Sequence, residues 1–136
     1  MPIPAKAFCD TSFFYACLDA RDINHLAALA ALEAAEGTIL CTTWDVISET
    51  LTLLRYRSGY RQAMAFWTDV CPSLHVVRYG DGVRVEAVEV FRRYGRDHRF
   101  SFCDALSFVV VSTLLGQIPC LSFDRDFRRL GLSVMP

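Results

Sequence analysis

Short apolar runs with the character of β-strands alternate with helical patterns along the whole chain, and this alternation limits the possible folds more than any other feature. The sequence predicts strands at 5–9, 38–41, 74–78, 119–123 and 132–134. It predicts helices from about residue 12, over 22–36, from 42 or 43 to 57, beyond Gly59 to 71, over 81–95 and over 101–116, with a helical turn after Asp124. The alternation predicts an α/β fold with three layers, in which helices cover both faces of a mostly parallel sheet. Ligands of such folds bind at the carboxyl ends of the strands.

Two local signals mark helix ends. Gly37 is expected to close the helix over 22–36 as a C-cap. Thr42 or Thr43 is expected to cap the next helix, with Thr42-x-x-Asp45 forming a capping box. Aromatic residues nearby, among them Phe66 and Trp67, are expected to lie in the core.

The chain has 136 residues, of which 53% are hydrophobic and 21% charged, which indicates a single globular domain over 1–136. No stretch is long and uncharged enough to span a bilayer, and the N-terminus lacks the features of a signal peptide, so a cytoplasmic location is expected. The six cysteines show no C-x-x-C spacing and no matching histidines, so buried free thiols are expected rather than disulfides or a zinc site.

The net charge of −1 gives no indication of nucleic-acid binding. Lys6 is the only lysine among the 14 basic residues, so the others are arginines. Arginine binds phosphate through two parallel hydrogen bonds, which makes the placement of these side chains informative.

Four carboxylates carry the functional argument. Asp10 and Asp124 each follow a predicted strand, where an aspartate is commonly a turn residue or an N-cap. Asp104 lies in the first turn of an apolar helix that is expected to be buried, and a buried carboxylate is costly unless it is paired or binds a metal. Its alternative role is the capping box Ser101-x-x-Asp104, and both roles are compatible. Glu49 lies at the margin of the apolar face of its helix, where most glutamates are only solvated.

These positions converge on one edge of the sheet. Carboxylates brought together without a fixed cation repel one another, and a hard divalent cation with oxygen ligands relieves that repulsion. The sequence therefore predicts a Mg²⁺ or Mn²⁺ site, a kind of site that suits phosphodiester hydrolysis.

The order of these motifs resembles that of the PIN-domain family. Asp10-Thr-Ser12, the segment from Thr43 to Arg55 around Glu49, Ser101-Phe-Cys-Asp104-Ala-Leu-Ser107 and Ser122-Phe-Asp124-Arg-Asp-Phe127 resemble its four acidic motifs in order. The resemblance covers essentially the whole chain and implies a PIN-like three-layer α/β/α fold. It implies a Mg²⁺- or Mn²⁺-dependent ribonuclease, often the toxin of a VapC-type toxin–antitoxin pair.

Residue by residue, the resemblance implies that Asp10, Glu49, Asp104 and Asp124 hold the metal and position the water. The hydroxyl of Thr11 or Ser12 would support the site. Cys103 departs from the family pattern, which commonly has a hydroxyl residue there. Asp126 stands where histidine often occurs, and it is either an outer carboxylate of the site or the N-terminal charge of a short helix.

Arginines flank the last two acidic motifs and are predicted to bind substrate phosphates: Arg93, Arg96, Arg99 and Arg125. Their alternative role is to complement a helix dipole in solvent, and the two roles are compatible. The resemblance also implies RNA as substrate, a homodimer, and an antitoxin as partner.

Three other classes of protein are alternatives. A PIN-fold module that binds RNA or protein but cleaves poorly is the main alternative, although intact acids argue against it. A receiver domain needs a late lysine, and Lys6 is the only one. A haloacid-dehalogenase-type phosphatase needs an aspartate two residues after the first, where this chain has Ser12.

Overall fold

The computed structural model describes residues 4–136. A five-stranded sheet in the order β3-β2-β1-β4-β5 forms its centre, and every neighbouring pair of strands is parallel. The strands are β1 (Lys6–Cys9), β2 (Ile39–Thr42), β3 (His75–Val76), β4 (Cys120–Leu121) and β5 (Val134–Met135). The predicted parallel α/β sheet is confirmed, with strands shorter than the apolar runs suggested.

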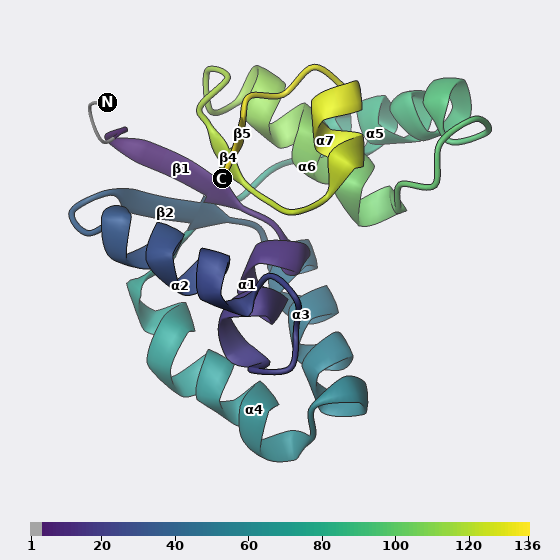
Figure 1. The fold of residues 1–136 in the computed structure, drawn as a ribbon. Helices are drawn as coiled ribbons and strands as arrows, with labels where there is room; N and C mark the ends of the chain where they lie inside the picture. Colours follow the sequence, from purple (N-terminus) through teal and green to yellow (C-terminus); the bar gives the residue numbers. More distant parts are fainter. Residues whose placement is uncertain (1–3) are drawn as a thin grey trace.

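Helices cover the sheet on both sides (Figure 1). On one side lie α1 (Thr11–Leu18), α2 (His25–Ala34), α3 (Trp44–Arg57) and α4 (Tyr60–Ala65), the last continuing through a π-helical turn (Phe66–Val70) and a 3-10 turn (Cys71–Ser73). On the other side lie α5 (Asp81–Tyr94), α6 (Phe102–Thr113) and α7 (Arg125–Arg129). This arrangement follows from the strand order, because right-handed crossovers towards β3 and towards β5 place their helices on opposite faces.

The central strand β1 defines the switch point of the sheet. Phe8 pairs with Cys41 of β2 on one side and with Cys120 of β4 on the other. The chain leaves β1 and β4 in opposite directions across the sheet, so a crevice opens at their carboxyl ends. These ends carry Asp10 and Ser122.

The main core forms around β1 and α1. Phe8, Phe13, Phe14 and Phe66 are almost completely buried, and the Phe14 and Phe66 rings pack with centroids 5.0 Å apart. Trp67 differs from the expectation, because 43% of its surface is exposed. No helix in the described part of the chain is both long and apolar enough to cross a membrane.

Two predicted elements have different bounds in the structure. Helix α2 begins at His25 rather than Asp22, because the Asp19 and Asp22 carboxylates accept the backbone N–H groups of Arg21 and Asn24 and form turns instead. The final strand is Val134–Met135 rather than 132–134. Its pairing with β4 starts only at Ser133, whose carbonyl accepts the Cys120 N–H.

The predicted capping box at Thr42 was also wrong. Thr43 caps α3 by accepting the Val46 N–H, whereas the Thr42 hydroxyl donates to the Cys9 carbonyl at 2.9 Å. Asp45 accepts a hydrogen bond from Tyr79 instead of closing the box. Gly37 adopts the left-handed conformation, with φ of +87°. The predicted C-cap at Gly37 was wrong, because α2 ends at Ala34 and Ala35 is its C-cap.

The buried Thr42 hydroxyl ties the ends of β1 and β2 together, so Thr42→Val should lower the free energy of unfolding by about 1–2 kcal/mol. Thr113→Val is the matched control, because its hydroxyl bonds only to Val109 one turn back in α6. Chemical denaturation measures both. Equal stability of the two variants would contradict a tie between the strands.

Candidate metal and nuclease site

Asp10 lies directly after β1, and three hydrogen bonds fix its carboxylate. Oδ1 accepts from the Ser12 hydroxyl at 2.8 Å and from the Phe13 N–H at 3.0 Å. Oδ2 accepts from the Ser122 hydroxyl at 2.6 Å. Asp10 is therefore the N-cap of α1 and is also bonded to Ser122, directly after the neighbouring strand β4. The residue is only 3% exposed.

Two serines connect the β1 end to the segment after β4. Ser12 accepts the Phe123 N–H at 2.9 Å, and Ser122 accepts the Asp124 N–H at 3.0 Å. One hydroxyl, that of Ser122, thus contacts the side chain of Asp10 and the backbone of Asp124. Ser122 was missed in the sequence, although a hydroxyl two residues before Asp124 in an apolar run is a usable signal.

Asp104 belongs to the capping box at the start of α6. Its side chain accepts the Ser101 N–H at 2.9 Å, and the Ser101 hydroxyl accepts the Asp104 N–H at 3.1 Å. The box holds the carboxylate at the helix start through one oxygen. Asp104 is half-buried rather than enclosed, so its second oxygen remains available.

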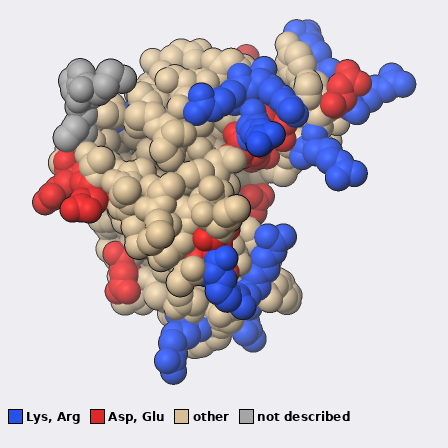
Figure 2. Space-filling view, in the orientation of Figure 1, with Lys and Arg blue, Asp and Glu red and all other residues tan. Residues whose placement is uncertain are grey.

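Glu49 reaches the same region from α3, where it is half-buried. Burial raises the pKa of the adjoining Cys103 thiol, and the negative charges of Glu49, Asp104, Asp45 and Asp10 raise that pKa further. Cys103 therefore lies among carboxylates from three different elements. Figure 2 shows acidic atoms at the indentation in the right side of the molecule, close to basic side chains.

The carboxylates disfavour one another's ionisation. Burial raises the pKa of Asp10 to about 6, and the charge of Asp124 adds to the effect. Burial raises the pKa of Asp104 to about 7, with further contributions from Asp124, Asp10 and Glu49. The pKa of Asp124 is raised as well, chiefly by burial, while Arg129 acts to lower it. The structure thus gathers all four predicted acids within electrostatic range.

The predicted supporting residues behave differently from one another. The Ser12 hydroxyl bonds to Asp10, whereas the Thr11 hydroxyl is buried and makes no hydrogen bond. Asp126 lies in the first turn of α7, donates its N–H to Asp124 Oδ1 at 2.9 Å and pairs with Arg129 at 3.3 Å. Its position is that of a charge at a helix N-terminus.

The four predicted substrate arginines do not form one group. Arg125 begins α7 and lines a small cavity of about 130 Å³ together with Ser122 and Asp124. Arg93 instead borders a hollow beside Glu86 and Glu89 of α5. Arg96 and Arg99 are exposed in the connection from α5 to α6, and the described contacts join neither of them to a carboxylate of the site.

The donor set fits a hard divalent cation by its chemistry. It offers only carboxylate oxygens, which Mg²⁺ and Mn²⁺ prefer. Burial, with smaller contributions from the neighbouring carboxylates, raises the pKa of Asp10 to about 6 and that of Asp104 to about 7. Within residues 4–136, no group of three or more histidine, cysteine or acidic side chains is drawn together closely enough to form a ready ligand shell. The fit therefore rests on donor type and charge.

Comparison with known proteins identifies the family. The PIN domain family matches residues 7–132. The chain therefore belongs to the PIN domain family.

Within that family, its relatives are VapC ribonucleases. It is 31% identical over 127 residues to a VapC ribonuclease of Archaeoglobus fulgidus, covering 89% of this chain and 78% of that protein. It is 34% identical over 133 residues to the 23S rRNA-specific endonuclease VapC20 of Mycobacterium tuberculosis, covering 91% and 93%. The crystal structure of VapC20, described as a sarcin-ricin loop cleaving toxin, superposes with a TM-score of 0.81 at 31% identity, covering 93% of this chain and 95% of that one.

The raised pKa values predict how stability depends on pH in EDTA. The folded-state pKa values of about 6 and about 7 exceed the ordinary 3.8, so the folded protein binds these protons more tightly than the unfolded chain. The resulting contribution is fully present below pH 3.8 and is lost as the pH rises through 6 and 7.

Asp104→Asn should flatten this dependence and stabilise the metal-free protein at pH 8 by an amount on the order of 1–2 kcal/mol after solvent screening. The amide oxygen can still accept the Ser101 N–H, so the capping box is kept. Chemical denaturation in EDTA at pH 5 and pH 8 measures the effect. A variant less stable than wild type at pH 8 would show that the ionised Asp104 carboxylate does not destabilise the metal-free protein.

Proposed function

We propose that the chain, as a single PIN domain over 1–136, is a Mg²⁺- or Mn²⁺-dependent endoribonuclease that hydrolyses phosphodiester bonds of RNA. The observation that carries the proposal is the joining of Asp10 and Asp124 through Ser122 at the switch point, with Asp104 and Glu49 within electrostatic range. The VapC ribonucleases that this chain resembles support the assignment.

The roles of the acids follow from their contacts. Asp10, Glu49, Asp104 and Asp124 would hold the cation, and the bound cation would activate water and stabilise charge that develops on the phosphate. Asp10 is oriented from two sides by Ser12 and Ser122, so its carboxylate cannot rotate freely. The backbone N–H of Ser101 orients Asp104 from the α6 side.

Ser12 and Ser122 act as positioning residues, because their hydroxyls donate to the Asp10 carboxylate. Removing such an outer partner commonly costs tenfold or more in activity while leaving the fold in place. Arg125, next to Asp124, is suited to bind a phosphate of the substrate. Arg93 near the end of α5, and Arg96 and Arg99 in the connection to α6, would provide further positive charge.

The RNA target is proposed from the relatives. VapC20 is described as specific for 23S rRNA and as cleaving the sarcin-ricin loop. A ribosomal RNA loop is therefore the first substrate to offer this protein.

Cleavage of 5′-labelled large-subunit ribosomal RNA tests the function. Wild type should cleave with Mn²⁺ and fail with EDTA, Asp104→Asn should lose at least about a hundredfold in rate, and Ser122→Ala about tenfold. Asp69→Asn, an exposed carboxylate on the π-helical turn, is the matched control and should cleave as wild type does. Activity that survives EDTA or the Asp104 substitution would refute the metal–carboxylate mechanism. Absence of cleavage would favour a PIN-fold binding module.

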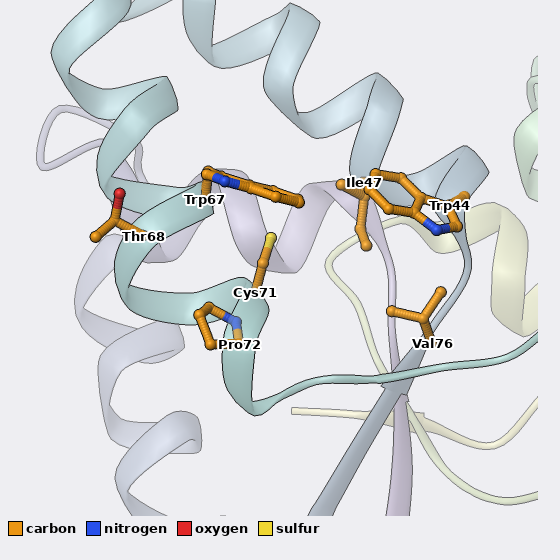
Figure 3. Close-up of a pocket in the computed structure, with 7 residues that line it drawn as sticks. All are labelled: Trp44, Ile47, Trp67, Thr68, Cys71, Pro72 and Val76. Carbon is orange, nitrogen blue, oxygen red and sulfur yellow. The ribbon is translucent and has the colours of Figure 1, made fainter.

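The toxin role in a type II toxin–antitoxin pair, and a homodimer, are proposed on the same relationship. Exposed apolar surface supports a protein partner. Ile23, just before α2, is 95% exposed, and Leu26, in the first turn of α2, is 79% exposed. Trp44 and Trp67 line a hollow of about 380 Å³, and the centroids of their rings lie 5.8 Å apart (Figure 3). Exposed tryptophans beside a hollow are typical of protein interfaces.

If the protein is a toxin, its induced expression in a bacterial host should arrest growth, because ribosomal RNA is cleaved. Asp104→Asn expressed to the same level should permit growth, since the carboxylate is lost while the fold is kept. Growth curves and primer extension on ribosomal RNA measure the two effects. Equal arrest by both proteins would contradict a toxic nuclease activity.

A further inference from the structure

Arg84 makes two contacts near the start of α5. Its guanidinium carbon lies 4.9 Å from the centre of the Tyr79 ring, and Nη1 pairs with Asp81 at 2.8 Å. The Asp81 side chain is 97% exposed, so this ion pair contributes little. The guanidinium carries five N–H donors, most of which remain free for a ligand.

Tyr79 is in turn attached to the helix that carries Glu49. Its hydroxyl donates to Asp45 Oδ2 at 2.5 Å, a contact between residues 34 positions apart that joins the β3–α5 connection to α3. Asp45 lies one helical turn before Glu49, and therefore on the same side of α3. Asp45 is also one of the carboxylates that act on Cys103. The Tyr79 ring is thus anchored at the margin of the acidic site.

A matching arrangement lies on the opposite side of the site. Asp126 follows Asp124 by two residues and binds Arg129 at 3.3 Å. Asp45 and Asp126 therefore lie near the predicted metal-binding residues Glu49 and Asp124. Asp126 pairs with Arg129 directly, and Asp45 is linked to Arg84 through the Tyr79 ring. An RNA strand that approaches four acids needs fixed positive charge beside them, and these arginines are held where they can supply it.

We propose that Asp45 and Tyr79 are positioning residues that hold Arg84 beside the acidic site, where its guanidinium binds a backbone phosphate of the RNA strand next to the scissile bond. This inference rests on the proposed function. It assigns Asp45 to the phenol rather than to the cation, and it adds to the substrate surface a residue upstream of Arg93, Arg96 and Arg99.

The first test measures RNA affinity without cleavage, by the anisotropy of a fluorescein-labelled single-stranded RNA with Ca²⁺ in place of Mn²⁺. Arg84→Gln should weaken binding about tenfold, the loss expected for a charged hydrogen bond. It should also reduce the slope of log Kd against log salt by about 0.7, the value for one phosphate contact on a single strand. Arg92→Gln is the control, because Arg92 makes the same i,i+3 ion pair with Glu89 on the same helix.

The second test separates positioning from direct binding. Tyr79→Phe keeps the ring but loses the bond to Asp45, so it should weaken binding about threefold and add nothing in the double variant with Arg84→Gln. Asp45→Asn should raise KM for cleavage and leave kcat and the Mn²⁺-induced rise in Tm unchanged. If the contacts served only the fold, the variants would lower stability without this specific loss of RNA affinity and rise in KM.

Three results would overturn the inference: Arg84→Gln binding like Arg92→Gln, additive losses in the double variant, or Asp45→Asn abolishing both kcat and the Mn²⁺ effect on Tm. The last would make Asp45 a metal ligand. A wild-type protein that binds RNA through Arg84 but cleaves none would refute the nuclease proposal alone. A wild type that binds no RNA would refute both.

Discussion

The position of Asp10 between β2 and β4 is the constraint on which the rest of the site depends. Because β1 is paired on both sides, the residue that follows it emerges where the chain crosses in opposite directions, at the crevice of a parallel sheet. The hydrogen bonds from Ser12 and Ser122 then bind the two loops at this crevice to one carboxylate. The hydrogen bond from the Asp124 N–H to the Ser122 hydroxyl positions Asp124. Helices α6 and α3, which cover opposite faces of the sheet, bring Asp104 and Glu49 near.

This arrangement trades stability for function. Burial, with a smaller contribution from the neighbouring carboxylates, raises the pKa values of Asp10 and Asp104, so the ionised site lowers the stability of the metal-free protein at neutral pH. The fold offsets the cost with local bonds: the cap at Asp10, the capping box at Asp104 and the Asp126–Arg129 pair. Each of these bonds also restricts a side chain of the site. Capping and site geometry are therefore the same interactions, and the alternative roles weighed for Asp10 and Asp104 are compatible.

The sequence predicted the parts that depend on local pattern. Strand–helix alternation gave the parallel sheet, and an aspartate after an apolar run located Asp10 and Asp124. The sequence did not predict the features that depend on contacts between residues far apart in the chain. Thr42 was expected to cap a helix, but β1 supplies a better acceptor in the Cys9 carbonyl. The Tyr79–Asp45 bond joins residues 34 positions apart, so nothing local marks Arg84 as fixed. Trp67 was expected in the core because it belongs to a group of aromatic residues around Phe66. It instead borders an exposed hollow, which forms where α3 packs against the π-helical turn.

The central claim is that the four acids at the switch point share a divalent cation. Anomalous diffraction from crystals grown with Mn²⁺ tests it directly, because manganese can be located without reference to activity. We expect a peak between Asp10 and Asp104, with carboxylate oxygens as its nearest ligands and Asp124 or Glu49 completing the shell. Asp45 should remain bonded to Tyr79. A peak elsewhere, or no ordered manganese in wild-type crystals at millimolar concentration, would contradict the account.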